Sequence, residues 1–397
     1  MKVLMLGWEL PPHNSGGLGV ACYELCKSLS QHNIDIDFIV PYQAEHNIDF
    51  MRVSSIDTDT TFDDINFNAY GAAKNINSKN INIFAEYELF TRKAINMISQ
   101  KNFDIIHAHD WLTFKAALRI KQLKNRPLIL HVHSVESDRS GNNRGNEIVR
   151  EIEENSMHSA DQIIAVSQHT KNKIISEYGI EPSKIDVVHN SINATVEIDS
   201  GPNAYHYLSA MKLKGYKIVT NIGRLTVQKG LTNFLRSAQR VIAVHPKTLF
   251  LIVGSGEQYT ELVNLAAELG ISDKILFADF QRGKKWRDAF KIADLFVMPS
   301  VSEPFGLTPL EAINYGTPSL VSKQSGVSEV FKNCLKVDYW DIDEMSNLIA
   351  SAIQSDAMLS ELVDKASAEV ELMSWTDSSK RIANFYRRHQ KLSEVNK

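Results

Sequence analysis

Two glutamates, Glu303 and Glu311, stand in a segment whose residue types suit a phosphorylated, hydroxyl-rich ligand. The letters TPLE at 308–311 predict a helix start. Thr308 would be the N-cap, Pro309 the first helical residue and Glu311 the partner in a capping box. The two carboxylates can accept hydrogen bonds from sugar and ribose hydroxyls. A capping box alone would also explain Glu311, and a solvated loop carboxylate would explain Glu303.

Groups that favour a diphosphate stand next to these glutamates and after an earlier apolar run. Gly306 and Leu307 can present backbone N–H groups to a phosphate at the predicted helix start. Arg224 and Lys229 follow the apolar run 216–222 in the sequence GRLTVQKG. Arginine offers a fork of donors and lysine a compact charge, so the pair suits a pyrophosphate that gains charge as a sugar departs. Two surface cations are the alternative interpretation.

Two glycine-containing loops complete the phosphate and nucleotide candidates. Gly254 follows the run 248–253 and would let a base or ribose approach the backbone closely. Gly16 and Gly17 precede a predicted helix in the first half. A nicotinamide fingerprint is not expected at this helix, because Cys22 occupies its third glycine position.

Four histidines occupy alternate positions near the ends of two apolar runs. His107 and His109 belong to the run 104–108 and its end, and His131 and His133 to the run 127–132 and its end. Alternate residues of a strand share a face, so each run carries one histidine pair. We expect His133 to contact a sugar. A metal site is not expected, since no paired cysteine or H-x-x-x-H spacing accompanies the histidines.

The segment HDW that closes the first of these runs is a candidate for the acceptor side. His109 and Asp110 are polar, and the ring of Trp111 could stack on a sugar. Any single histidine here could equally be a satisfied structural residue.

Apolar runs alternate with amphipathic segments along the whole chain, which is typical of doubly wound, parallel α/β sheets. The predicted strands are 2–7, 34–40, 104–108, 127–132, 162–166, 185–189, 216–222, 248–253, 274–278, 294–299 and 317–321. Helical patterns include 18–31, 231–244, 257–269 and 309–315. So many strands exceed one open sheet. We predict two Rossmann-like domains, 1–195 and 196–375, and a C-terminal helix, 376–397, that returns to the first.

Composition excludes several other classes of protein. The chain has 397 residues, 43% of them hydrophobic, and a net charge of −4, which argues against a general nucleic-acid binder. Its three cysteines indicate reduced thiols rather than a disulfide framework. No apolar run is long enough to span a membrane. We therefore expect a soluble, cytoplasmic protein. The oligomeric state is left open.

Together these residues resemble the retaining GT-B glycosyltransferases of family 4, which include glycogen-synthase-like enzymes. The resemblance covers nearly the whole chain. It implies an interdomain cleft, a nucleotide-diphosphate sugar as donor, no metal or other cofactor, and transfer with retention. It matches Glu303 to the glutamate at the donor sugar, Glu311 to the ribose ligand, Arg224 and Lys229 to the diphosphate, and His133 to the transferred sugar. Gly16 and Gly17 match the glycines near the donor phosphate and sugar.

The expected activity is transfer of a glucose-like hexose to a saccharide or another hydroxyl acceptor, including synthesis of an α-glucan. One departure is Asn14, which stands where bacterial glucan synthases carry a lysine. A glycosyl phosphorylase and a nucleotide-sugar epimerase are alternatives with the same fold, and a non-catalytic sugar-nucleotide-binding protein is a remote one. The basic, apolar segment 112–126 leaves open a peripheral contact with the inner face of a membrane and a lipid-linked acceptor.

Overall fold

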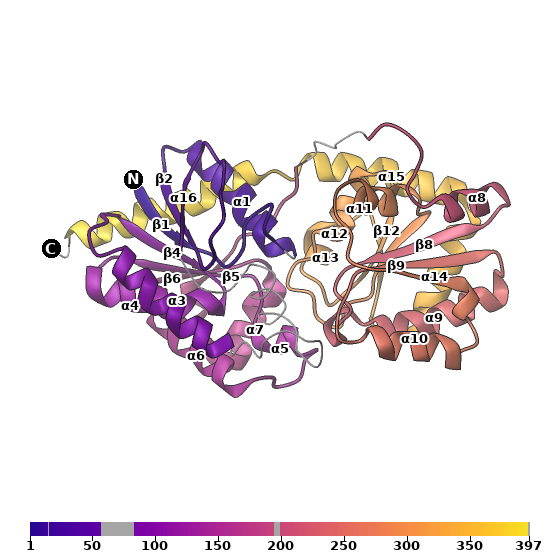
Figure 1. Ribbon diagram of the computed structural model, residues 1–397, viewed down its shortest axis with the longest axis horizontal. Helices are drawn as coiled ribbons and strands as arrows, with labels where there is room; N and C mark the ends of the chain where they lie inside the picture. The colour runs from indigo at the N-terminus through magenta and orange to yellow at the C-terminus, as the bar shows by residue number, and fades with distance from the viewer. Residues whose placement is uncertain (15, 57–82, 194–198, 396–397) are drawn as a thin grey trace. The chain divides into compact units, whose positions relative to one another are not determined.

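The computed structural model describes residues 1–14, 16–56, 83–193 and 199–395, which form two compact units (Figure 1). Unit 1 comprises Met1–Arg139, Arg144–Ser191 and Ser374–Lys397. Unit 2 comprises Ser140–Asn143 and Ile192–Met373. The described residues include a parallel sheet in each unit, with helices on both faces.

The sheet of unit 1 has the strand order β3-β2-β1-β4-β5-β6-β7. Its strands are β1 (Lys2–Leu6), β2 (Asp35–Val40), β3 (Arg52–Ser55), β4 (Ile105–His109), β5 (Leu128–Val132), β6 (Gln162–Ala165) and β7 (Ile185–Val187). The helices are α1 (Gly17–Ser30), α3 (Ile83–Met97), α4 (Trp111–Lys124), α5 (Glu136–Arg139), α6 (Glu147–Ser159), α7 (Gln168–Tyr178), the 3-10 turn η1 (Pro182–Lys184) and α16 (Trp375–Val395).

The sheet of unit 2 has the equivalent order β10-β9-β8-β11-β12-β13. Its strands are β8 (Lys217–Ile222), β9 (Thr248–Val253), β10 (Ile275–Ala278), β11 (Leu295–Met298), β12 (Ser319–Ser322) and β13 (Leu335–Val337). The helices are α8 (His206–Leu213), α9 (Leu231–Val244), α10 (Tyr259–Glu268), α11 (Gly283–Lys291), α12 (Thr308–Asn314), α13 (Val327–Val330), α14 (Ile342–Gln354) and α15 (Asp356–Glu371), with 3-10 turns η2 (Val227–Lys229) and η3 (Ser272–Lys274).

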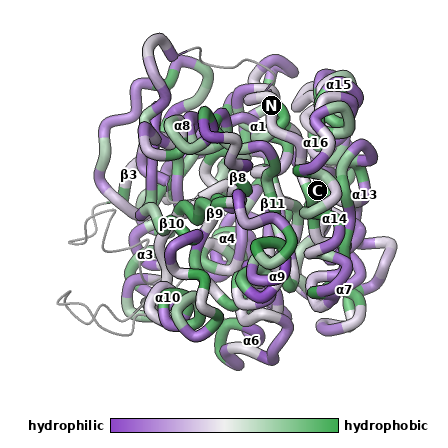
Figure 2. The backbone as a smooth tube through the Cα atoms, turned by 90° about the vertical axis from the view of Figure 1, so that its right-hand side faces the viewer, coloured by the Kyte–Doolittle hydropathy of each residue, from purple (hydrophilic) through white to green (hydrophobic). Residues whose placement is uncertain are grey.

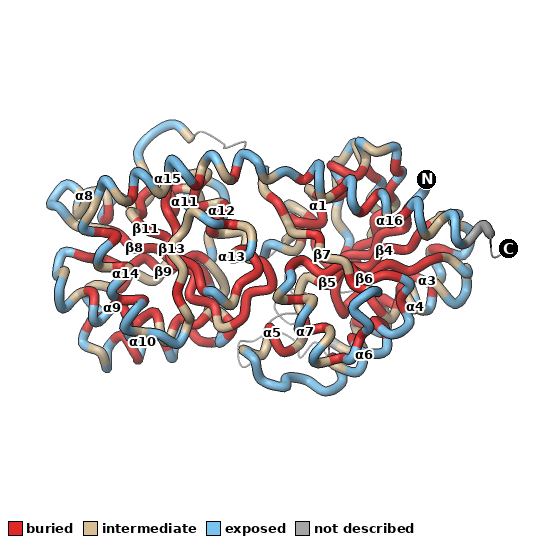
Figure 3. The backbone as a smooth tube through the Cα atoms, turned by 180° about the vertical axis from the view of Figure 1, so that it is seen from behind, coloured by how far each residue is buried: buried red, intermediate tan, exposed pale blue. Residues whose placement is uncertain are grey.

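The buried strands explain why the apolar runs predicted the fold. All six residues of β9 and all five of β5 are buried, as expected for parallel strands covered on both faces. Figure 3 shows buried strands inside each unit and exposed residues on the outer helices. In Figure 2 the strand β9 is hydrophobic, whereas the helices that cover the sheets carry both colours. The doubly wound α/β fold predicted from the sequence is confirmed.

The C-terminal helix α16 belongs to unit 1, where it packs on α1. The hydroxyls of Ser28 and Ser379 are hydrogen-bonded at 2.8 Å, and His32 Nε2 lies 3.0 Å from the same Ser379 hydroxyl. Tyr386 of this helix is fully buried and is hydrogen-bonded to Nδ1 of His107 on β4. The end of the chain therefore contributes to the core of the unit in which the chain began.

In each sheet, the first three strands are added one after another to one side of the sheet. The chain then returns to the first strand and adds the later strands on its other side. Loops that follow neighbouring strands on either side of such a reversal diverge, which leaves room for a ligand beyond the carboxyl ends of the strands. In unit 1 this point lies between β1 and β4, and in unit 2 between β8 and β11.

Gly230 provides a test of how tightly the loop after β8 is packed. Its φ is +67°, and a Cβ there would lie 2.1 Å from the Pro299 carbonyl oxygen. Gly270 has nearly the same φ, +69°, with open space around it. We predict that Gly270→Ala costs about 1–2 kcal/mol, from the left-handed backbone alone. Gly230→Ala should cost roughly 3–5 kcal/mol, because the backbone must also move. Urea unfolding followed by circular dichroism measures both, and equal losses would contradict the close contact.

Candidate functional site

In unit 2, the loops after β8, β9 and β11 are hydrogen-bonded to one another at the carboxyl edge of the sheet. The Leu225 amide donates to the Ser255 carbonyl at 2.9 Å, which joins the loops after β8 and β9. Gln228 joins the loops after β8 and β11. Its side-chain Nε2 donates to the Ser302 carbonyl at 3.0 Å, and its backbone carbonyl accepts from the Val301 amide at 2.8 Å. The loops that carry the predicted site residues therefore form one connected layer.

Lys229 and Glu303 form an ion pair across two of these loops. Lys229 Nζ donates to Glu303 Oε2 at 2.5 Å, and the Ser300 hydroxyl donates to the same oxygen at 3.0 Å. Glu303 is 8% exposed, so the pair is largely removed from water. Glu303 Oε1 receives no hydrogen bond from a described residue. One carboxylate oxygen is thus fixed by the protein, and the other can still accept hydrogen bonds.

Arg224 and Gly254 lie in the same layer of loops. Arg224 is half-buried, and its Nη2 donates to Gln228 Oε1 at 3.4 Å. Gly254 has a φ of +145°, and a Cβ there would lie 1.9 Å from the Gly223 carbonyl oxygen. Glycine at 254 therefore serves close packing of two loops, whether or not a ligand also approaches it.

The predicted capping box at the start of α12 is wrong. The helix begins at Thr308, so Thr308 is itself helical and Leu307 precedes the helix in a helical backbone conformation. No side chain caps the helix, and the Thr308 hydroxyl points to Met298 Sδ at 3.8 Å. Glu311 is therefore not explained as a cap. It is half-buried, and loss of hydration raises the pKa of its carboxyl group to about 7.

Gly306 and Leu307 form the bend that leads into α12. Gly306 has a φ of +96°, and a Cβ there would lie 3.0 Å from Glu303 Cγ. The backbone N–H groups of Gly306, Leu307 and Thr308 have no hydrogen-bond partner among the described residues. Both predicted phosphate donors of this loop, the amides of Gly306 and Leu307, thus remain available beside the Glu303 carboxylate.

In unit 1, Gly16 and Gly17 lie at the amino end of α1 after a loop that begins at β1. Both are exposed, and Gly16 has open space around it. The buried carboxylate of Glu9 accepts a hydrogen bond from the Gly19 amide at 3.0 Å. Glu9 therefore occupies part of the helix start. The sequence reasoning did not single it out, although a glutamate three residues after a strand is a signal that could have done so.

The four histidines form one stack, because β4 and β5 pair with His109 opposite His131. Ring centroids are 4.5 Å apart for His107 and His109, and 4.3 Å apart for His131 and His133. His109 Nδ1 and His133 Nε2 are hydrogen-bonded at 2.9 Å. Burial, with smaller contributions from the neighbouring imidazoles, lowers the pKa of His107, His109 and His131 well below the usual value. Burial lowers the pKa of His133 to about 3. All four rings are therefore neutral at physiological pH.

Asp110 holds the turn that carries His133. Its carboxylate accepts hydrogen bonds from the His133 amide at 2.6 Å and the Ser134 amide at 3.3 Å. Asp110 has a φ of +58°, which is uncommon for a residue with a side chain. Burial raises the pKa of its carboxyl group to about 7. Arg139, which donates to the Ser134 carbonyl at 3.1 Å, supports the same turn and was not anticipated.

The segment HDW is buried rather than facing an acceptor. His109 is 0%, Asp110 2% and Trp111 3% exposed. The Trp111 ring lies against the rings of Phe84 and Tyr87, so it offers no exposed face on which a sugar could stack. His109 and Asp110 are each hydrogen-bonded to His133 and support it. Unlike His109, Asp110 and Trp111, His133 is half-buried, so solvent reaches its side chain.

The basic segment 112–126 forms most of α4. Its apolar residues Leu112, Phe114 and Ile120 are buried in unit 1, while Leu123 is exposed. Lys115 pairs with Glu88. The apolar face of this helix is therefore already covered by protein. Among the described residues, no helix combines the length and hydropathy that crossing a membrane requires.

Known proteins with the same organisation were found by comparison of sequence and structure. The chain is 28% identical to an uncharacterized glycosyltransferase of Methanocaldococcus jannaschii, over 98% of both chains. It is 25% identical to the glycogen synthase of Mycobacterium tuberculosis, over 84% of this chain and 80% of that protein. The structure matches Anabaena HepE in complex with UDP and glucose with a TM-score of 0.73 and 18% identity, covering 98% of this chain and 100% of that one.

Two family models match successive parts of the chain. The model of glycosyltransferase family 4 matches residues 15–196, and the model of glycosyl transferases group 1 matches residues 210–369. The first model covers β2 to β7 and the second covers β8 to β13, and most of the loops described above lie within them. The chain therefore belongs to the group 1 glycosyltransferases and has the two-sheet GT-B fold of that group.

Proposed function

We propose that the protein is a retaining glycosyltransferase that moves a glucose-like hexose from a nucleoside-diphosphate sugar to a saccharide or another hydroxyl acceptor. The observation that carries this proposal is the Lys229–Glu303 pair, in which Glu303 keeps Oε1 for a ligand while Oε2 is fixed. A carboxylate held in this way can orient sugar hydroxyls without turning away from them. The glycogen synthase among the relatives and the UDP and glucose of the structural neighbour support the choice of sugar and nucleotide.

Arg224 and Lys229 are assigned to the diphosphate. An ammonium group has three donors, and Glu303 uses one of those of Lys229, so the same lysine can hold a phosphate oxygen as well. Arg224 adds a planar fork suited to phosphate oxygens. The amides of Gly306 and Leu307 add neutral donors from the opposite loop. Together these groups would stabilise the charge that grows on the leaving diphosphate.

Retention is proposed because the leaving group can be stabilised without a covalent intermediate. A nucleoside diphosphate departs as a stabilised anion, and the acceptor hydroxyl can enter from the face that it leaves. The assigned donors act on the diphosphate directly, so the proposed reaction needs no metal ion. In unit 1 we assign His133 to the sugar, and Gly16 and Gly17 to the donor phosphate.

The donor can be identified before the acceptor is known. The protein is incubated with a panel of nucleoside-diphosphate hexoses, and slow hydrolysis of the donor is followed by release of the nucleotide. A glycosyl phosphorylase would instead form a sugar phosphate that depends on inorganic phosphate. An epimerase would convert one nucleotide sugar to another without releasing the nucleotide. Absence of nucleotide release with every donor, even after a range of saccharide acceptors is added, would contradict the proposal.

We predict that Glu303→Gln lowers turnover by about 100- to 1,000-fold. The glutamine amide can still accept a hydrogen bond from Lys229, but it presents no negative charge to the sugar. The matched control is Glu361→Gln, which removes one carboxylate of an exposed ion pair with Lys365. Turnover is measured at saturating donor, and melting temperature shows whether each variant is folded. Near-normal turnover by folded Glu303→Gln would refute the role of Glu303.

Arg224→Ala should weaken binding of the free nucleoside diphosphate by about 10- to 100-fold, the loss expected for charge-assisted hydrogen bonds. Calorimetric titration with UDP measures the affinity, and the nucleoside uridine provides the comparison. Uridine binding should change little, because uridine lacks the phosphates. If Arg224→Ala weakens the binding of both ligands equally, Arg224 does not act on the diphosphate.

Glu311 should lose a proton when its carboxylate accepts hydrogen bonds from ribose hydroxyls. With a pKa near 7 in the free protein, it is about half protonated at pH 7, and hydrogen bonds to the ionised form lower that pKa. Nucleotide binding to the wild type should therefore release up to about half a proton more than binding to Glu311→Gln. Titration calorimetry in buffers of different ionisation enthalpy measures the difference, in which the ligand's own titration cancels. Equal proton release would contradict contact of Glu311 with the ribose.

A further inference from the structure

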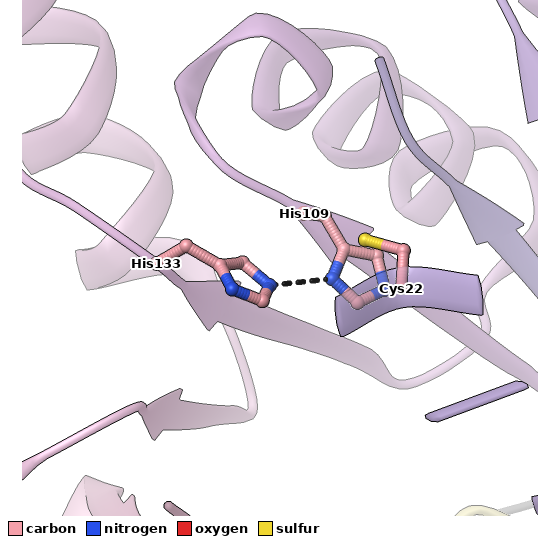
Figure 4. Close-up of side chains that lie close together, drawn as sticks. All are labelled: Cys22, His109 and His133. Carbon is pink, nitrogen blue, oxygen red and sulfur yellow. Dashed lines mark hydrogen bonds between the residues drawn. The ribbon is translucent and has the colours of Figure 1, made fainter. Parts of the chain in front are cut away.

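We propose that Cys22, His109 and His133 form a binding site for one zinc-like divalent ion, and that occupation of this site inhibits the enzyme. The three side chains come from α1, β4 and the residue just after β5 (Figure 4). Their ligand atoms all lie within 4.8 Å of one another. Neither the expected reaction nor any of the site assignments above requires an ion here.

The chemistry of the donors favours a borderline-soft transition metal. A thiolate and two neutral imidazoles are ligands that Zn²⁺ takes in tetrahedral sites, with water or another small ligand in the fourth position. A neutral imidazole carries a lone pair on one of its ring nitrogens, which can bind a metal ion. Hard cations such as Mg²⁺ prefer oxygen ligands and are not expected to bind.

The present contacts leave this cluster incompletely satisfied. His109 Nε2 is buried and has no hydrogen-bond partner among the described residues, so this nitrogen can take up the proton when an ion binds Nδ1 of the same ring. The Cys22 side chain is 1% exposed, and its sulfur forms no hydrogen bond with a described residue. Most buried polar atoms in proteins have a partner, so a cluster of this kind is a candidate for a ligand.

The required movement is small. His109 Nδ1 and His133 Nε2 already face each other at 2.9 Å, and Figure 4 shows the Cys22 sulfur beside the His109 ring. A tetrahedral zinc ion would need nitrogen atoms about 3.3 Å apart and sulfur–nitrogen separations of about 3.6 Å. On binding, the ion replaces the proton between the two rings, which moves to another ring nitrogen. The thiol proton of Cys22 is released to water, so one proton leaves for each ion bound.

A second group of buried donors, His107, His109 and His131, suits an ion less well. The rings of His107 and His131 are stacked with an interplanar angle of 10°, so their in-plane lone pairs do not converge. All three are fully or almost fully buried, which leaves no route for an ion. His133 is half-buried and gives the proposed group a side that is open to solvent. Both groups include His109, so only one of them can hold an ion at a time. We expect the ion to bind the group that contains the thiol.

Inhibition follows from the role of His133. An ion on Nε2 of His133 fixes the ring against His109 by coordinate bonds, which are harder to open than the hydrogen bond that joins the two rings in the free protein. If His133 must leave His109 to contact the transferred sugar, the occupied protein cannot make that contact. The inhibitory effect therefore rests on the proposed function, whereas binding of the ion does not.

The test uses Co²⁺ as a spectroscopic probe of the full-length chain after treatment with a chelator. We expect one Co²⁺ per chain, with the near-ultraviolet charge-transfer absorption of a cobalt–thiolate bond, and displacement of the Co²⁺ by Zn²⁺, which binds such ligands more tightly. Cys22→Ser should abolish the charge-transfer band and weaken binding by at least about 10-fold. Cys26→Ser is the matched control, because Cys26 is one turn further along α1, equally buried, and its sulfur contacts Met5 Sδ at 3.2 Å. It should keep the band.

X-ray absorption by the zinc-loaded wild type gives a measurement that needs no variant. One sulfur at about 2.3 Å and two nitrogens at about 2.0 Å are expected. Absence of a cobalt–thiolate band in the wild type, or a zinc shell without sulfur, would overturn the site. Once a donor is known, Zn²⁺ should inhibit the wild type and not Cys22→Ser. Equal inhibition of both would overturn the inhibitory role, and lack of any transferase activity would leave the spectroscopic result intact.

Discussion

The ion pair between Lys229 and Glu303 is the contact on which the candidate donor site depends. It joins the loops after β8 and β11, which diverge because the sheet reverses direction between those strands. Without a bridge, each loop would present one isolated charge. A largely buried pair contributes little net stability, since desolvation offsets the attraction, but loss of one partner is costly because the other charge is left unpaired. Lysine and glutamate therefore fix each other's positions, and Gln228 and Ser300 fix the frame around them.

The unit 1 loops are organised by the opposite principle. There, charged and polar side chains are buried and form hydrogen bonds with other groups of the same unit. Asp110 is hydrogen-bonded to the amide of His133, and Arg139 to the carbonyl of Ser134, so a single half-buried histidine stands on a rigid base. The positive φ of Asp110 is tolerated because two backbone amides depend on its carboxylate. Residues in sparsely populated backbone conformations are often found at functional sites.

Much of the fold could be predicted from the sequence because parallel strands are buried on both faces and read as apolar runs. Two strands escaped that signal. β3 contains Arg52 and serines, β13 has a single buried residue, and both lie at a sheet edge, where one side is not covered by another strand. The site was predicted in part. The residues that follow the strands could be found from their positions, but the capping box was wrong because Thr308 is already helical. The histidine stack required the register between β4 and β5, which no periodicity within one strand can give.

The two units differ in how strongly their residues limit the chemistry. In unit 2, the cation of Lys229 and one carboxylate oxygen of Glu303 remain able to bind further groups. The proposed function assigns phosphate to the cation and sugar hydroxyls to the carboxylate. In unit 1, the residues that looked most specific for an acceptor, Asp110 and Trp111, are committed to packing and to the His133 turn. Under the proposed function, an acceptor at unit 1 would be recognised by less distinctive side chains and by backbone groups. Under that proposal, the acceptor could change without disturbing the Lys229–Glu303 pair, because both residues of the pair belong to unit 2.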